Sequence, residues 1–382
     1  MGVDNVLDTV HLINLFSTID SLVEQLKYVQ SEKAKIVAIE KIIWHRDRNN
    51  ALDALIHAAR NDESAAVREA AARALDKFTG KRVINELMES FLKDNSPVVR
   101  EAAASSLEWI GGDPCIIDRL INSLLVDTRN DVRQESARLL GLFNDYRAVQ
   151  SLIQALVDTD LLVQEKAALS LGKIKSPLAI DPLIELLVDK TFRPGVIKGL
   201  GMIGKPALKP LLQITGNRDY LVRSRAVRVL GEIGGPLAAE KLSMLLNDRS
   251  KSVHGAAEIE LVYTGKSTIP FIIAAAQKKK RLKSKRSRDF LIRVLGLLRE
   301  LGPDDEQVRP LTSVLVALLN HHSKDLDKGT VSYTLKLLST QNITPEQIEE
   351  IRPLLLAILL THCDDDLSMK INAKKILKAA KE

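Results

Sequence analysis

The sequence is poor in cysteine and in aromatic residues, and it has no long uncharged apolar run. Only Cys115 and Cys363 occur in 382 residues, so no disulfide framework is expected and a reducing, cytoplasmic compartment is indicated. Aromatic residues make up 4% of the chain, which argues against strands built from aromatic and β-branched residues. No run of about 18 uncharged apolar residues occurs, so we expect no membrane span. The N-terminus lacks the basic and apolar regions of a signal peptide.

Recognisable catalytic motifs are missing as well. The chain has no His-Glu pair and no zinc-type spacing of cysteine and histidine. The pattern Gly199-x-Gly201-x-x-Gly204 matches dinucleotide-binding glycines, but it falls where a helix is expected to end rather than after a strand. The turns at His321-His322 and at 362–366 offer ligands suited to a transition metal, although their spacing matches no known site. We therefore expect no catalytic residues, no metal and no cofactor.

What the sequence does contain is a repeat. An Asp, a short polar turn, Val-Arg, small residues and Leu-Gly return at a period of roughly 29 to 34 residues. After each Val, apolar or small residues recur at helical spacing, which predicts an amphipathic second helix. A further apolar-periodic stretch before each Asp predicts a first helix, and the Asp begins the turn between them. The clearest copies are anchored at Val67, Val99, Val132, Val163, Val222 and Val253.

The pattern D-x4-V-R-x3-A-A-x-A-L-G resembles the short HEAT repeats of phycobilin lyase subunits and related proteins, most clearly over residues 50–262. The resemblance implies an all-α fold, a right-handed α-solenoid (superhelix) of tandem two-helix repeats, with about eleven units. We expect a capping helix in residues 1–30, short repeats in 31–265 and longer, divergent repeats in 266–382, with a basic loop at 278–288. Such repeats serve many functions, so the resemblance predicts the fold and leaves the function open. Lack of His-Glu pairs argues against deoxyhypusine hydroxylase activity.

The Asp before each Val and the Arg after it occupy equivalent places in every unit. In a stack, we expect the Asp of one unit to meet the Arg of the next, forming a charged ladder that stabilises the fold. The residues expected in the ladder are Asp62, Arg68, Asp94, Arg100, Asp127, Arg133, Asp158, Arg193, Arg223 and Asp248.

The formal net charge is +6 and the sequence pI is near 9.1, a mildly basic balance that favours an anionic partner only weakly. From Lys198 onward, the solvent-facing positions of the second helices lose their negative residues. The dense basic run at 278–288 suits either a solvated loop or a grip on phosphates or an acidic protein. The residues expected to bind a partner are Arg138, Lys198, Arg225, Arg228, Arg293, Lys278, Lys279, Lys280, Arg281, Lys283, Lys285, Arg286 and Arg288.

These observations favour a non-catalytic scaffold or adaptor that holds a protein partner with acidic patches on a concave face lined by the second helices. The resemblance suggests an alternative, a phycobilin-lyase-like enzyme or accessory subunit acting on a tetrapyrrole or its carrier protein. A third hypothesis is nucleic-acid binding through the C-terminal basic half. No aromatic residue interleaves the basic run, so base stacking there is not supported. Whether the chain is an enzyme stays open at this point.

Overall fold

The computed structural model describes residues 18–189, 194–278, 285–322, 327–341, 343–360 and 367–379. Over these ranges the chain consists of helices joined by short turns, without a strand. The all-α solenoid expected from the repeat is therefore confirmed. The chain forms two compact units: unit 1 comprises residues 1–183 and 194–199, and unit 2 comprises residues 184–193 and 200–382.

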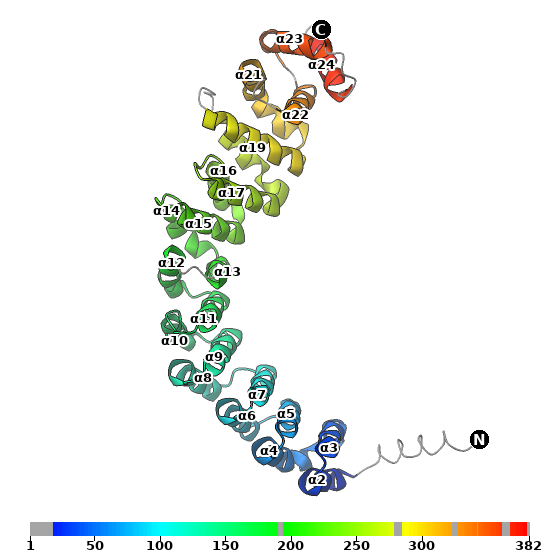
Figure 1. The fold of residues 1–382 in the computed structure, drawn as a ribbon, viewed down its shortest axis with the longest axis vertical. Helices are drawn as coiled ribbons and strands as arrows, with labels where there is room; N and C mark the ends of the chain where they lie inside the picture. Colours follow the sequence, from blue (N-terminus) through cyan, green and yellow to red (C-terminus); the bar gives the residue numbers. More distant parts are fainter. Residues whose placement is uncertain are drawn as a thin grey trace, which may run out of the picture. The chain divides into compact units, whose positions relative to one another are not determined.

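Unit 1 is a stack of helix pairs, each with a first and a second helix. Within this unit the second helices lie on the inner side of the curved stack, and the first helices lie on the outer side (Figure 1). Its first helices are α2 (Ile19–Tyr28), α4 (Leu52–Asn61), α6 (Lys81–Lys93), α8 (Pro114–Val126) and α10 (Val149–Ala155). Its second helices are α3 (Glu32–Trp44), α5 (Ala65–Ala74), α7 (Pro97–Ile110), α9 (Asn130–Phe143) and α11 (Leu161–Ile174).

The pair formed by α12 (Ile180–Val188) and α13 (Pro194–Ile203) spans the boundary between the units, and unit 2 continues the same order. Its remaining first helices are α14 (Leu208–Ile214), α16 (Gly235–Leu245), α18 (Ile269–Gln277), α21 (Thr312–His322), preceded by the short α20 (Asp305–Val308), and α23 (Pro345–Leu360). Its second helices are α15 (Tyr220–Ile233), α17 (Lys251–Thr264), α19 (Lys285–Leu301), α22 (Lys328–Leu338) and α24 (Leu367–Ala379).

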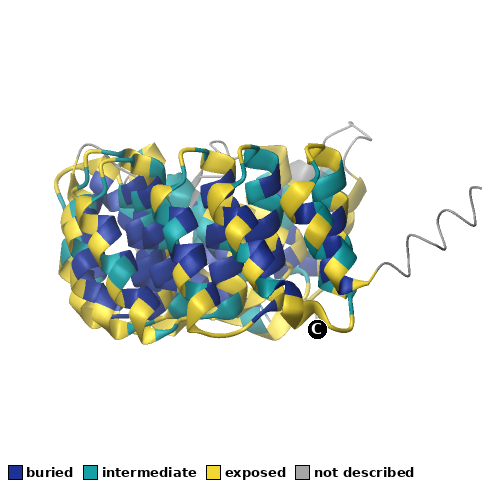
Figure 2. Cartoon of the chain, turned by 90° about the horizontal axis from the view of Figure 1, so that it is seen from below, coloured by how far each residue is buried: buried dark blue, intermediate teal, exposed yellow. Residues whose placement is uncertain are grey.

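The repeated valine and leucine positions form the core. Val67, Val99 and Val163 are fully buried, and so are Leu107 and Leu171 near the ends of their helices. Buried residues concentrate where helices contact one another, while the helix ends and turns are exposed (Figure 2). Burying one such side chain contributes about 1.5–3 kcal/mol. The core therefore runs lengthwise through each unit, and each pair depends on its neighbours.

The Asp of each repeat ends the first helix by a local hydrogen bond. Its side-chain oxygen accepts the backbone N–H two residues further on, an Asx turn that offers the backbone an alternative to continuing the helix. The bond measures 3.0 Å at Asp62, 2.8 Å at Asp94, 2.7 Å at Asp158 and 2.8 Å at Asp248. The second helix then begins within a few residues; at α11 the N-cap Asp160 accepts from the N–H groups of Leu162 and Val163.

Glycines near the ends of α9 and α11 mark close approaches between repeats. A Cβ on Gly172 would lie 2.7 Å from the Cα of Gly199, and one on Gly141 would lie 2.6 Å from the Cα of Ser170. Backbone cannot yield at such distances, so these contacts require glycine. Gly199 and Gly201 belong to α13, and Gly204, at φ +78°, follows its end. The dinucleotide-like glycines thus serve helix packing.

Residues 4–29 were expected to cap the stack. Their described part contains α2, which packs against α3 as the first helix of a pair, and residues 1–17 lie outside the described residues. Around the expected basic loop at 278–288, α18 ends at Gln277 and α19 begins at Lys285. None of the helices in the described ranges combines the length and apolar character needed to cross a bilayer.

Replacing Gly172 by alanine tests whether the close approach limits the fold. We expect Gly172→Ala to lower the free energy of unfolding by about 1–3 kcal/mol, because α11 and α13 must separate to admit the methyl group. Gly255, inside α17, has open space around its would-be Cβ and is the matched control. Gly255→Ala should raise stability by up to about 1 kcal/mol through helix propensity. Urea denaturation followed by far-UV circular dichroism measures both; equal destabilisation by the two variants contradicts the close-packing account.

Candidate partner-binding face

A ladder of ion pairs joins the inter-helix turns of successive repeats. Arg68 donates to both carboxylate oxygens of Asp94, at 2.7 and 3.0 Å. Arg133 holds Asp158 at 2.8 Å through two nitrogens, and Arg223 holds Asp248 at 2.9 and 2.8 Å. Lys35 begins the series with a 2.6 Å contact to Asp62. Such bidentate pairs fix orientation as well as distance, so each pair sets how one repeat meets the next.

The same guanidinium groups also join the two ends of their own turn. The third nitrogen of Arg68 donates to the carbonyl oxygen of Asp62 at 2.9 Å, and that of Arg133 donates to the carbonyl of Asp127 at 3.0 Å. One side chain thus satisfies a helix-terminal carbonyl of its own repeat and a carboxylate of the next. Each ladder arginine therefore couples local helix capping to stacking between repeats.

The ladder differs from the sequence expectation in direction and membership. The Arg of one repeat meets the Asp of the following repeat, the reverse of the expected order. Arg100 pairs with Asp131 (Nε–Oδ2 3.0 Å), while Asp127 accepts from Arg129 within its own turn. The reason is that Asp131, one turn further on, lies within reach of Arg100 and leaves Asp127 to its nearer neighbour. Gln164 stands at the arginine position of α11 and carries no charge, and Arg193 lies outside the described residues.

The ladder carboxylates are acidic groups held in their charged form. Burial works to raise the pKa of Asp94, Asp158 and Asp248, because it penalises the charged carboxylate. Hydrogen bonds from the paired arginine and from the backbone N–H two residues on, together with the arginine charge, outweigh burial. The pKa of each of the three therefore lies below its usual range.

Removing one ladder charge should lower the free energy of unfolding far more than removing an exposed charge does. We expect Asp158→Asn to lower the free energy of unfolding by about 1.5–3 kcal/mol, because Arg133 loses a charge-assisted bond in a largely covered site. The control is Asp53→Asn, which breaks an exposed pair with Arg82 in which the two side chains are 78% and 69% accessible. That change should cost no more than about 0.5 kcal/mol. Chemical denaturation measures the free energy of unfolding of both variants. Similar losses in the two would show that the ladder pair stabilises the fold no more than an exposed ion pair does.

Low pH should remove the contribution of the ladder ion pairs to the stability of the fold. The folded-state pKa values are lowered, so the pairs stabilise the fold above the unfolded-state value of about 3.9 and lose that contribution as pH falls through the folded values. We expect the denaturant concentration at which half of the protein is unfolded to decrease once the pH is below about 4. The difference in free energy of unfolding between the native chain and Asp158→Asn should become smaller over the same pH range. If this difference in free energy is as large at pH 3 as at pH 7, the charge of Asp158 is not its cause.

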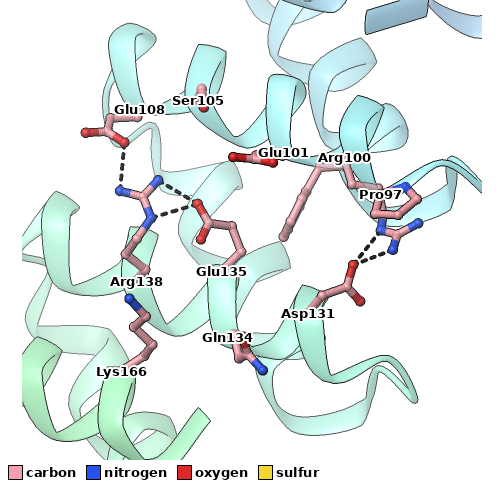
Figure 3. A pocket seen from close by; sticks show the side chains of 11 residues that line it. Pro97, Arg100, Glu101, Ser105, Glu108, Asp131, Gln134, Glu135, Arg138 and Lys166 are labelled. Atoms are coloured by element: carbon pink, nitrogen blue, oxygen red, sulfur yellow. Dashed lines mark hydrogen bonds and ion pairs between the residues drawn. The ribbon is translucent and has the colours of Figure 1, made fainter. Parts of the chain in front are cut away.

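A cavity of about 500 Å³ opens on the second-helix face of unit 1, between α7, α9 and α11. Phe91 of α6 is among its lining residues and is almost fully buried. Arg138 lies between Glu108, at 2.7 Å, and Glu135, at 2.6 Å, as Figure 3 shows. Burial disfavours the charged guanidinium, but the two carboxylates outweigh it and hold the pKa of Arg138 above its usual value. The charges lining this cavity are thus largely paired with one another.

Unit 1 also carries a set of exposed side chains, one from each of four successive repeats. Trp44, Lys77, Trp109 and Leu142 each stand nine residues after a ladder cation, so they occupy equivalent places in neighbouring repeats. Three of them lie in the second helices α3, α7 and α9, and Lys77 lies in the 3-10 turn that follows α5. Trp44 is 86% exposed and Trp109 80% exposed. The Lys77 ammonium lies 5.9 Å from the centre of the Trp109 ring, within range of a cation–π contact. We call these four residues the tryptophan row.

The structure uses two of the expected partner-binding arginines internally. Arg225 donates to the carbonyl of Leu187 at 2.9 Å, and Arg293 donates to the carbonyl of Leu246 at 3.0 Å. Both carbonyls lie at or next to the C-terminal end of a first helix, where cations are favoured. The side chain of Arg293 is only 19% exposed, and burial lowers the pKa of its guanidinium. The expectation that Arg293 faces solvent was therefore wrong.

The other expected binding residues are spread over the surface. Lys198 and Arg228 are exposed on α13 and α15. Lys278 lies 3.7 Å from Glu240, and Arg286 donates to the carbonyl of Asn247. Lys285, Arg286 and Arg288 belong to the first turn of α19 rather than to a loop. Lys279, Lys280, Arg281 and Lys283 lie outside the described residues, as do residues 362–366 of the expected metal-ligand cluster. No set of three metal-ligating side chains gathers within the described ranges.

The tryptophan row was not singled out from the sequence. Neither Trp44 nor Trp109 was assigned a role from the sequence. A signal was nevertheless present, because both follow the ladder cation of their repeat by the same number of residues. Equivalent positions in a solenoid lie on one face, so the equal spacing was sufficient to predict a shared row.

Comparison with family models decides the classification. The model for HEAT repeats matches residues 19–108, 117–194 and 189–262, more than half of the chain. The chain belongs to the HEAT-repeat family. The resemblance noted from the Asp and Val-Arg pattern is thus confirmed. Comparison with curated protein sequences gives no match.

Solved structures with a similar fold include karyopherins. Kap121p bound to the extreme C-terminus of the protein phosphatase Cdc14p is 12% identical, with a TM-score of 0.57 over 96% of this HEAT-repeat chain and 46% of that one. Kap95p, from a study of its binding to RanGDP, is 13% identical, with a TM-score of 0.50 over 94% and 56%. The HEAT-repeat chain thus spans about half the length of these karyopherins. The CpcE–CpcF phycocyanin lyase of Nostoc sp. PCC7120 matches at 24% identity and a TM-score of 0.33, over 60% and 92%.

Proposed function

We propose that this HEAT-repeat chain is a cytoplasmic, non-catalytic scaffold that binds an extended segment of a protein partner along the second-helix face of unit 1. One observation carries the proposal. The chain has only two tryptophans, and both are exposed at equivalent positions of their repeats in unit 1. Tryptophan is usually well covered in folded proteins, and it is enriched at the centres of interfaces.

The row and the cavity have the composition expected of an interface. Trp44, Trp109 and Leu142 offer apolar area, and the cavity between α7, α9 and α11 presents charges that are already paired, such as Arg138 with Glu108 and Glu135. Paired charges at the edge cost less to cover than isolated ones. Because the row follows the stack from repeat to repeat, an elongated polypeptide matches it better than a compact ligand does.

Fold-level comparisons support the proposal. Kap121p, whose fold is similar, has been solved with Nup53p and with the C-terminus of Cdc14p, so that solenoid binds protein segments. The similarity concerns the fold, and this chain covers about half of that protein. The partner with acidic patches stays a prediction that now depends on Lys198, Arg228 and the segment 278–288. The tetrapyrrole and nucleic-acid alternatives also stay predictions.

The double variant Trp44→Ala/Trp109→Ala tests the proposal. We expect it to weaken partner binding by about a hundredfold or more, since buried tryptophan anchors contribute about 2 kcal/mol or more each. Tyr28→Ala is the matched control, because Tyr28 is a 75% exposed aromatic residue at the opposite end of its helix pair from Trp44. Tagged chains are purified from the native host with and without nuclease, and proteins lost only with the double variant are identified by mass spectrometry.

The identified protein is then purified and its dissociation constant is measured by titration calorimetry for each variant. Equal affinity of the native and double-variant chains would eliminate the tryptophan row as the binding surface. Recovery that disappears on nuclease treatment would favour the nucleic-acid alternative instead.

A further inference from the structure

A second cavity, of about 620 Å³, lies within unit 2 between the end of α19 and the helices α22 and α24. Its volume is within the range of small-molecule sites, about 300–1,000 Å³. It is separate from the tryptophan row, and nothing in the proposed scaffold function uses it. Its lining includes two cations, Arg299 and Lys336, and a single carboxylate, Asp305.

The side chains of the two cations have no partner among the described residues. Both residues are exposed, and neither the Arg299 guanidinium nor the Lys336 ammonium makes an ion pair or hydrogen bond to any residue in the described part of the chain. This distinguishes them from Arg225 and Arg293, which cap helix ends, and from the ladder arginines, which hold carboxylates. An arginine and a lysine on adjoining elements, both unpaired and both lining one cavity, provide positive charge for a ligand.

The single carboxylate of the lining is already engaged. Asp305 accepts a hydrogen bond from the Thr340 hydroxyl at 2.9 Å, and its backbone carbonyl accepts from the Gln341 amide at 2.8 Å. These bonds tie the start of α20 to the end of α22. Asp305 thus has a structural role, and it offsets only one of the two cations.

Hydroxyl groups supply neutral donors around the same cavity. Ser332, Tyr333 and Ser368 line it from α22 and α24. Burial raises the pKa of Tyr333 to about 12, against the opposing effect of the nearby Arg299 charge, so its phenol stays protonated at neutral pH. A half-buried, protonated phenol is a donor that an oxygen-rich ligand can use.

We propose that this cavity binds the phosphate group of a phosphate monoester, held by Arg299 and Lys336 with Ser332, Tyr333 and Ser368 donating to its oxygens. Cationic and hydroxyl donors converge there from three helices, and a tetrahedral oxyanion accepts bonds from several directions at once. The remaining volume accommodates the group that carries the phosphate. That group is either a small metabolite or the phosphorylated side chain of a protein, and both present the same chemistry.

Titration calorimetry in a phosphate-free buffer tests the proposal on the full chain. The probes are glycerol 3-phosphate, a phosphoserine peptide and the same peptide without phosphate. We expect at least one phosphorylated probe to bind and the unphosphorylated peptide to show no binding. A phosphopeptide that binds tighter than glycerol 3-phosphate identifies a protein source, and the reverse order identifies a metabolite. Failure of both phosphorylated probes to bind at about 10 mM overturns the proposal.

Matched variants separate the site from general electrostatics. Arg299→Gln/Lys336→Gln should weaken binding at least about tenfold, because charge-assisted hydrogen bonds are lost. Lys328→Gln removes an exposed positive charge from α22 outside the cavity lining and should leave affinity unchanged. Tyr333→Phe should weaken binding with little change in charge. Circular dichroism and thermal melting confirm that the variants fold. Equal weakening by Lys328→Gln, or none by the double variant, would refute the site.

Discussion

Close stacking of adjacent second helices is the constraint on which the rest of the molecule depends. The α11–α13 contact at Gly172 and Gly199 leaves no room for a side chain, so the spacing of repeats is set by backbone contact. Ladder pairs such as Arg133–Asp158 then fix the orientation at the turn edge, where bidentate geometry allows little rotation. With spacing and orientation both fixed, equivalent positions of successive repeats follow one another along the stack. The tryptophan row exists because of these two devices.

Arginine has two structural roles in the described part of this chain, and they explain why a count of charges does not locate a binding surface. Arg68 and Arg133 join repeats, whereas Arg225 and Arg293 satisfy carbonyl groups at the ends of first helices. Both uses draw on the planar guanidinium, whose several donors reach carboxylates and carbonyls in fixed directions. Only cations outside these roles are available to a ligand, and Arg299 is one of them. A net charge of +6 therefore says little about where a partner binds.

The fold was predictable because each repeat carries the same local signals. Val67 and its equivalents lie buried as the helical periodicity requires, and the Asp turns end the first helices where expected. The pairs of the ladder were harder to predict from the sequence, because the direction of stacking decides which Asp an arginine meets. Arg100, for example, pairs with Asp131 and not with Asp127. Burial of Arg293 was not predictable, since it depends on α16 and α19 meeting across the intervening chain. Periodicity within a helix predicts its own faces, while contacts between helices need the stack.

The two cavities differ in a way that bears on their ligands. In unit 1, Arg138 is held by Glu108 and Glu135, so a ligand gains little by approaching its charge, and the proposed partner relies on the tryptophan row instead. In unit 2, Arg299 and Lys336 are unpaired among the described residues, so a ligand that neutralises them gains electrostatic energy with little competition from the protein. An exposed, unpaired cation is solvated and costs the fold little, whereas an exposed tryptophan forgoes the burial energy that its ring would bring. A solenoid that leaves both of its tryptophans uncovered has therefore given up stabilisation that a partner can restore.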